Sequence, residues 1–147
     1  MNISNNLILI YENFLSNQEC NNYINYFLSN KGKIKQYRNT FIFKLFDPNL
    51  LNKLVNNFGI KKLNNPDNLE IVRWPENSFM DFHYDNGDDL AFIIYLNEDF
   101  LGGETIIDNL NIKPKIGKIV IFSNGKLLHK VNKIDKGDRY TLIGWYK

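Results

Sequence analysis

The stretch FMDFHYDNG, residues 79–87, holds one of the chain's two histidines, two residues before a carboxylate. If this stretch is extended, His83 and Asp85 point to the same face, because side chains alternate along a strand with a period of two. An imidazole and a carboxylate on one face can reach one metal ion; the alternative is an imidazole hydrogen-bonded to its neighbour in a turn. The second histidine, His129 in KLLHKVN, lies in another strand-like stretch. We therefore predict His83, Asp85 and His129 as metal ligands.

A second chemical signal is an arginine in an apolar, aromatic segment that is expected to be buried. Two histidines and one carboxylate form the facial triad that binds Fe(II) and leaves three coordination positions open. Arg139, one of three arginines, begins the apolar and aromatic run RYTLIGWYK. A guanidinium in such a strand is costly unless an anion pairs with it, and a carboxylate held by two parallel hydrogen bonds is a suitable partner. Thr141 lies on the same face and can add a hydroxyl. The alternative partners are the neighbouring carboxylates Asp135 and Asp138.

Two helices are predicted in the first third of the chain. Ser16 and Glu19 have the spacing of a capping box at a helix start. Apolar residues follow at helical spacing, and the glycine of KGK (31–33) is expected to end this helix. Asp47 followed by Pro48 predicts the start of a second helix, with an N-cap and a proline in the first turn.

After Pro66 the chain consists of short β-branched and aromatic runs bounded by Gly, Asn, Asp and Pro, which predict strands. These runs are LEIVRW (69–74), LAFIIYLN (90–97), ETIID (104–108), KIVIF (118–122) and YTLIGWY (140–146), and one more, LILIYENF (7–14), precedes the first helix. Regularly spaced short strands indicate a sandwich or barrel. We predict a single, mainly β domain over 1–147, a jelly roll with N-terminal helices packed on one sheet. Its helical part is expected at about 1–65 and its jelly-roll core at about 66–147.

Composition narrows the class of protein. The chain has 147 residues, 44% of them hydrophobic and 14% aromatic, which suits a folded domain rather than a disordered one. The net charge is only +2 and the lysines are scattered, so neither a nucleic-acid nor a membrane partner is expected. The single cysteine, Cys20, excludes an internal disulfide and is expected to be a small buried side chain. We see no secretory signal and no apolar run long enough to span a bilayer, and we predict a cytoplasmic protein.

Several segments, in order, resemble the prolyl 4-hydroxylase-like group of the Fe(II)- and 2-oxoglutarate-dependent dioxygenases. They are HYD at His83 and Asp85, the later His129, Arg139, YLNEDFLGGET (95–105), KPKIGKIVIF (113–122) and ENFLSNQEC (12–20). The resemblance runs over nearly the whole chain. It implies a double-stranded β-helix, with Fe(II) as the metal, 2-oxoglutarate and O2 as cosubstrates, and ascorbate as a further candidate cofactor.

The resemblance also assigns roles around the metal. It implies that Arg139 binds the far carboxylate of 2-oxoglutarate, that Tyr95 hydrogen-bonds the cosubstrate, and that Trp145 is an aromatic near that pocket. From its place on the same face as Arg139, Thr141 is expected to assist. The chain departs from the group in IVRWPENS, where Trp74 stands in place of a common tyrosine and the glycine usual after the proline is absent. The indole N–H can still donate a hydrogen bond, so Trp74 is a candidate pocket residue.

The implied activity is hydroxylation of a prolyl residue in a peptide or protein, with oxidative decarboxylation of 2-oxoglutarate to succinate and CO2. The same chemistry on a free amino acid or a small metabolite stays open, as does a non-redox, cupin-like metal-binding protein or an inactive β-barrel binding module. A nucleic-acid demethylase is disfavoured, because that family carries a further arginine where this chain has Trp145. The oligomeric state is not predicted.

Overall fold

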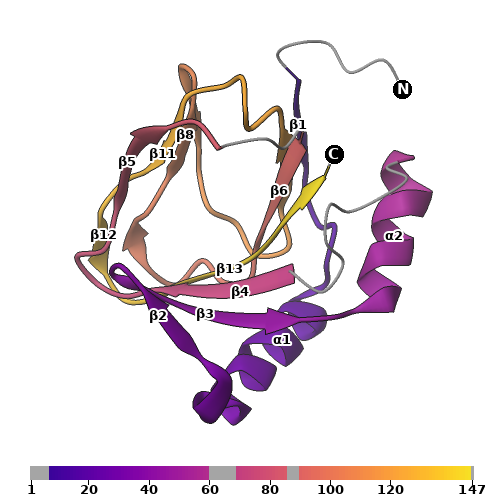
Figure 1. Ribbon diagram of the computed structural model, residues 1–147, viewed down its shortest axis with the longest axis vertical. Coiled ribbons are helices and arrows are strands. Elements are labelled where there is room, and N and C mark those ends of the chain that lie inside the picture. The colour runs from indigo at the N-terminus through magenta and orange to yellow at the C-terminus, as the bar shows by residue number, and fades with distance from the viewer. Residues whose placement is uncertain (1–6, 60–68, 86–89, 147) are drawn as a thin grey trace.

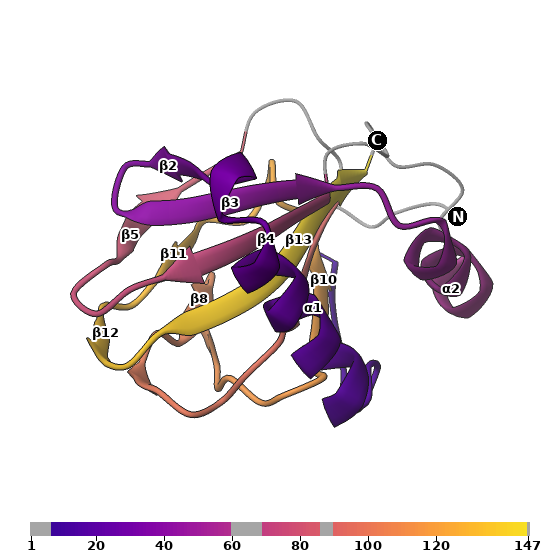
Figure 2. The ribbon, with the colours of Figure 1, turned by 90° about the horizontal axis from the view of Figure 1, so that it is seen from below.

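The computed structural model describes residues 7–59, 69–85 and 90–146. Two antiparallel sheets face each other, and two helices lie outside the larger sheet (Figure 1, Figure 2). This is the predicted mainly β jelly-roll architecture with helices packed on one sheet.

The larger sheet has seven strands in the order β1-β10-β6-β13-β4-β3-β2. They are β1 (Ile8–Tyr11), β2 (Lys35–Tyr37), β3 (Thr40–Leu45), β4 (Leu69–Trp74), β6 (Leu90–Tyr95), β10 (Ile119–Phe122) and β13 (Arg139–Tyr146). The smaller sheet has the order β5-β11-β8-β9, and a separate strand pair joins β12 to β7. These strands are β5 (Met80–His83), β7 (Leu101–Gly102), β8 (Thr105–Ile107), β9 (Leu110–Ile112), β11 (His129–Val131) and β12 (Ile134–Lys136).

The first helix begins where the sequence predicted and ends earlier. Helix α1 (Asn17–Ser29) starts with the capping box, in which Ser16 Oγ accepts from Glu19 N at 3.1 Å and Glu19 Oε1 accepts from Ser16 N at 3.0 Å. It ends at Asn30, whose side chain donates to the carbonyl of Tyr26 at 2.7 Å. The prediction that the glycine of KGK ends this helix is therefore wrong, and Lys31–Lys33 form a 3-10 turn instead.

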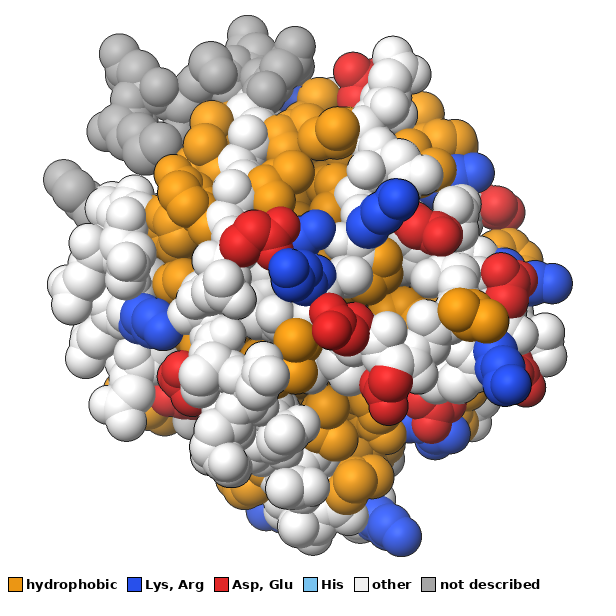
Figure 3. Space-filling model, turned by 180° about the vertical axis from the view of Figure 1, so that it is seen from behind, with side chains coloured by type: hydrophobic (Ala, Val, Ile, Leu, Met, Phe, Trp, Pro, Cys, Tyr) orange, Lys and Arg blue, Asp and Glu red, His pale blue; other side chains and the backbone are white. Residues whose placement is uncertain are grey.

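The second helix, α2 (Pro48–Phe58), confirms its predicted cap, because Asp47 Oδ1 accepts from Leu50 N at 3.1 Å. Neither described helix is long and apolar enough to cross a membrane. Charged side chains of both signs are interspersed on the face shown in Figure 3.

The segment predicted as helical, about 1–65, also contains the strands β2 and β3, which the sequence analysis did not predict. Strand β3 pairs with β4 from Phe41↔Arg73 to Leu45↔Leu69 and so extends the larger sheet. Phe43 and Leu45 on β3 are buried in the core beneath the helices. The N-terminal part therefore completes the sheet as well as covering it.

Strand alternation divides the larger sheet into two faces. On β6, Phe92 and Ile94 pack with the helices, whereas Ala91 and Tyr95 face the smaller sheet. The helix-side core also holds Cys20, which is fully buried as predicted. On β13 the residues in step with Arg139 face between the sheets, and this face carries the candidate site.

Candidate metal centre

The structure brings the three predicted metal ligands together. Strands β5 and β11 pair with His83 opposite His129, and the two ring centroids are 4.2 Å apart. Asp85 follows β5 directly, with Oδ1 3.4 Å from His83 Nε2 and Oδ2 3.6 Å from His129 Nε2. One donor atom from each residue lies within 4.8 Å of the other two. This cluster has the composition and size of a site for one metal ion.

Backbone carbonyls orient both imidazoles. His83 Nδ1 lies 2.8 Å from the carbonyl of Asp81, and His129 Nδ1 lies 2.8 Å from that of Leu127. A carbonyl only accepts, so each Nδ1 carries the proton, and a neutral ring then presents a bare Nε2. Two nitrogen lone pairs and the carboxylate of Asp85 thus converge on one point, and this arrangement requires a cation or a proton between them.

The electrostatics of the cluster agree with this requirement. Burial opposes ionisation of Asp85, but hydrogen bonds with His129 and His83 outweigh it and hold the pKa of this carboxyl well below its usual range. The hydrogen bond to Asp85 raises the pKa of His83, against the effect of burial.

Two N–H groups hold one oxygen of the Asp85 carboxylate, Oδ2. Asn124 Nδ2 donates to Oδ2 at 3.2 Å, and Trp145 Nε1 donates to the same oxygen at 3.3 Å. The resemblance implied that Trp145 lies near the cosubstrate pocket. In the structure, its indole N–H donates to Asp85, one of the candidate metal ligands. Asn124 was not predicted, because SNGK gives only a turn signal in the sequence, with no sign of a buried side chain.

Arg139 is a buried cation without a carboxylate partner in the described part of the chain. Its side chain is 1% exposed; Nε donates to Gly103 O and an Nη to Thr105 Oγ1, both at 3.0 Å. The guanidinium also lies over the rings of Trp74 and Tyr95, 5.2 and 5.3 Å from their centroids. Burial lowers the pKa of Arg139, opposed by its interaction with Tyr95.

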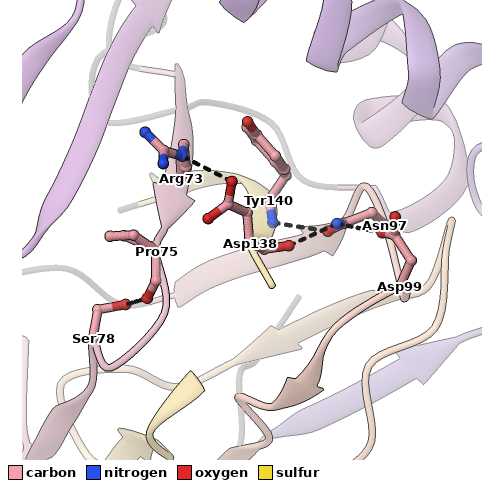
Figure 4. A network of polar contacts seen from close by, with 7 residues as sticks. All are labelled: Arg73, Pro75, Ser78, Asn97, Asp99, Asp138 and Tyr140. Atoms are coloured by element: carbon pink, nitrogen blue, oxygen red, sulfur yellow. Dashed lines mark hydrogen bonds and ion pairs between the residues drawn. The ribbon is translucent and has the colours of Figure 1, made fainter. Parts of the chain in front are cut away.

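Both alternative partners of Arg139 lie elsewhere. Asp138 pairs with Arg73 at 3.2 Å, and its backbone carbonyl accepts from Asn97 (Figure 4). Asp135 lies 3.9 Å from Lys133. The alternative explanation of Arg139, a salt bridge to either aspartate, therefore does not apply to this structure.

The other predicted cosubstrate residues surround Arg139 on one face of the sheet. Trp74 is its cross-strand neighbour on β4, and Tyr95 is the neighbour of Thr141 on β6. Tyr95 Oη lies 2.5 Å from Thr105 Oγ1, a residue that sequence reasoning had not singled out. The Thr141 hydroxyl and the Trp74 indole N–H are buried and have no hydrogen-bond partner among the described residues. Unsatisfied buried polar groups beside a buried cation indicate a site for a polar anionic ligand.

Comparisons with known proteins agree with this geometry. The family model for the 2OG-Fe(II) oxygenase superfamily matches residues 69–147. A PKHD-type hydroxylase of Prochlorococcus marinus (strain MIT 9301) is 30% identical over 131 residues, which cover 78% of this chain and 58% of that protein. The chain thus spans little more than half the length of this relative.

Solved structures share the fold. A viral collagen prolyl hydroxylase from Paramecium Bursaria Chlorella virus-1 matches with a TM-score of 0.72 and 22% identity, over 94% of this chain and 93% of that one. A prolyl hydroxylase from Trichoplax adhaerens, in complex with a hypoxia inducible factor peptide fragment, matches with a TM-score of 0.75 and 16% identity, over 95% and 82%. With the family match spanning both the histidine–aspartate cluster and Arg139, the chain belongs to the 2OG-Fe(II) oxygenase superfamily.

Proposed function

We propose that the chain is an Fe(II)- and 2-oxoglutarate-dependent dioxygenase in which His83, Asp85 and His129 bind the iron. Two neutral imidazoles and one carboxylate fit Fe(II), and their converging lone pairs favour a divalent cation. When bound, iron with 2-oxoglutarate and O2 supplies the oxidising power for C–H hydroxylation, while 2-oxoglutarate is decarboxylated to succinate and CO2. The protein's own groups orient the ligands and exclude water around them.

Arg139 is proposed to bind the far carboxylate of 2-oxoglutarate. Its charge is buried without a described carboxylate, and this single observation carries the cosubstrate assignment. Thr141 Oγ1 and Trp74 Nε1 are donors of the right kind nearby, because both are buried and lack a hydrogen-bond partner among the residues that the structure describes. Tyr95 supports the guanidinium through its ring. Trp74 thus stands where the family commonly has a tyrosine, and its indole N–H is the hydrogen-bond donor at this position.

The proposed substrate is a prolyl residue of a peptide or protein. The support comes from the relatives, which include a collagen prolyl hydroxylase and a prolyl hydroxylase that holds a peptide. A free amino acid or small metabolite is the alternative substrate for the same chemistry. A cupin-like metal protein without a cosubstrate is disfavoured, because metal binding alone does not require the buried charge of Arg139.

The first test is anaerobic titration of the metal-stripped protein with Fe(II) and then 2-oxoglutarate, followed by visible absorption. We expect a charge-transfer band that needs both ligands and is absent in His83→Ala. Arg139→Met should weaken 2-oxoglutarate binding about 100-fold or more, the scale of about 3 kcal/mol for losing one member of a buried charged pair. Arg73→Met is the matched control, because this arginine on the neighbouring strand already pairs with Asp138. Equal affinities in the two variants would remove the cosubstrate assignment.

The substrate is tested separately. Peptides that differ only by proline or alanine at one position are incubated with Fe(II), 2-oxoglutarate and air, and analysed by mass spectrometry for the gain of one oxygen atom. Gain on the proline peptide alone supports the proposal. Succinate formation stimulated by free amino acids, with no peptide product, would favour the alternative.

A further inference from the structure

The two oxygens of the Asp85 carboxylate have different surroundings. Oδ2 accepts two hydrogen bonds, from Asn124 Nδ2 at 3.2 Å and Trp145 Nε1 at 3.3 Å. A carboxylate oxygen offers about two lone-pair sites, so these donors occupy both. Oδ2 also lies 3.6 Å from His129 Nε2, farther than either N–H donor. Among the described residues, Oδ1 has a single polar contact, with His83 Nε2 at 3.4 Å, the ring nitrogen left bare by the Nδ1 contact. Oδ1 therefore keeps its lone pairs for another ligand.

Asn124 is fixed in the orientation that this arrangement needs. Its side chain is fully buried, in the turn that follows β10. Turning the amide over would point its oxygen at the ionised carboxylate of Asp85, which is repulsive, so the donor must face Oδ2. The backbone carbonyl of Asn124 also accepts from the amide N–H of Asp85 at 3.1 Å. Asn124 thus holds both the backbone and the side chain of Asp85.

Trp145 reaches the same oxygen from the opposite sheet. It lies on β13, pairs across the sheet with Ala91, and packs at the edge of the core between the sheets. Its hydrogen bond joins β13 to the residue that follows β5. The two donors come from separate elements, so the carboxylate plane is fixed in two directions.

We propose that Asn124 and Trp145 are positioning residues that make Asp85 a one-oxygen metal ligand, through Oδ1. This inference rests on the proposed function, in which Asp85 binds Fe(II). The triad leaves three positions of an octahedral ion open only if the carboxylate supplies a single oxygen. Two-oxygen binding would close one position that 2-oxoglutarate and O2 require. By occupying Oδ2, the two N–H groups keep that position open.

The test uses Co(II) alone, without 2-oxoglutarate, so that activity is not the readout. Trp145→Phe removes the N–H and keeps an aromatic ring, and Asn124→Ala removes the amide. Asn132→Ala is the matched control, because Asn132 Nδ2 donates to Glu104 Oε2, also at 3.2 Å, and makes no contact with Asp85. Affinity is measured by chelator competition, and the ligand-field spectrum is recorded at saturating Co(II).

We expect Trp145→Phe and Asn124→Ala each to weaken Co(II) binding about 10-fold or more, as is typical for residues that orient metal ligands. Both should also change the spectrum at saturation, which a general loss of stability would not do. Asn132→Ala should match the wild type in both respects. If Asn124→Ala does not fold, Trp145→Phe decides alone. A folded Trp145→Phe with wild-type affinity and spectrum overturns the inference, whereas a wild-type chain that binds no Co(II) overturns the metal assignment of the proposed function and this inference with it.

Discussion

At the scale of single residues, Arg139 is a charged side chain whose burial is costly to the ligand-free protein. Its guanidinium is 1% exposed and has hydrogen bonds to Gly103 and Thr105, but no described carboxylate neutralises it. Replacing an uncompensated buried charge with an apolar side chain of similar volume is often neutral or stabilising. The residue is therefore best explained by what it binds and not by what it contributes to folding.

We predict that Arg139→Met has a melting temperature equal to or above that of the wild type without ligands. The same variant should lose the extra stabilisation that 2-oxoglutarate gives in the presence of Mn(II). Thermal unfolding with and without these ligands measures both effects. Arg73→Met, which breaks the partly buried pair with Asp138, should keep the 2-oxoglutarate effect. A marked fall in the ligand-free melting temperature of Arg139→Met would instead assign this residue a structural role.

The cluster of His83 and Asp85 predicts opposite pH dependences with and without metal. The pKa of His83 is raised, so its contribution to stability is complete below the usual value of 6.5 and is lost as pH rises through the folded value. The pKa of Asp85 is lowered, so its contribution is present above the usual 3.8 and is lost as pH falls toward its folded value. A metal ion requires the neutral imidazole and competes with the proton.

As pH rises from about 6 to about 8, the melting temperature of the metal-free protein should therefore fall, because the stabilising contribution of His83 is lost. Over the same range the stabilisation by Mn(II) should grow. Thermal unfolding across this range, with and without Mn(II), measures both slopes. His83→Gln should flatten the slope of the metal-free protein. A stabilisation by Mn(II) that stays constant with pH would contradict the assignment of His83 as a ligand.

The sequence predicted the site residues that form a short local pattern. It did not predict the contacts between site residues that lie far apart in the chain. His83 ends β5 and Asp85 lies two residues further on, a spacing that the sequence displays directly. The hydrogen bonds of Asn124 and Trp145 to Asp85 join positions far apart in the chain, and no local pattern encodes such approaches. Thr105, which contacts Arg139, lay in a predicted strand and in a segment quoted for its resemblance, but it was given no role in the site.

At the scale of elements, the predicted strands are those with a clear run of β-branched or other apolar residues, including the three-residue β8 in ETIID (104–108). The missed strands β7, β9 and β12 have two or three residues each, too few to show a period. Strand β2 is exposed along its length and lies at the sheet edge, so it carries no apolar alternation at all. Its partner β3 was not predicted, because strong helix signals precede and follow it in the sequence.

The turn between β7 and β8 gives an element-scale prediction. Gly103 has a φ of +69°, and a Cβ there would lie 2.6 Å from Ile134 Cδ1 and 3.1 Å from Arg139 Cδ. Its carbonyl accepts from Arg139 Nε. Gly103→Ala should lower stability by about 1–3 kcal/mol through crowding and strain, and should weaken 2-oxoglutarate binding because Arg139 must move.

Gly32→Ala is the control for this turn, since Gly32 has no other group within 4 Å of an added Cβ. It should change neither stability nor affinity appreciably. Chemical denaturation and 2-oxoglutarate titration compare the two variants. If Gly103→Ala behaves like Gly32→Ala, then the turn does not position Arg139.

At the scale of the whole molecule, the site joins the two sheets. His83 and His129 belong to the smaller sheet, and Arg139 and Thr141 belong to β13 at the centre of the larger one. The helices lie on the opposite face of the larger sheet and make no part of the described cluster. Under the proposed function, a metal ion should therefore act mainly on the smaller sheet, whereas 2-oxoglutarate bound between the metal and Arg139 should connect both.

We predict that hydrogen exchange will separate these two effects. Mn(II) alone should protect the amides of β5 and β11, while protection of the first half of β13, around Arg139 and Thr141, should require 2-oxoglutarate as well. At concentrations 100-fold above the dissociation constant, a ligand that binds only the folded state adds about 2.7 kcal/mol of stability, which is ample to detect. In Arg139→Met, 2-oxoglutarate should add little to the protection given by Mn(II). If Mn(II) alone protected the first half of β13 as fully as both ligands together, the cosubstrate would not bridge the sheets, and its carboxylate would have to bind elsewhere.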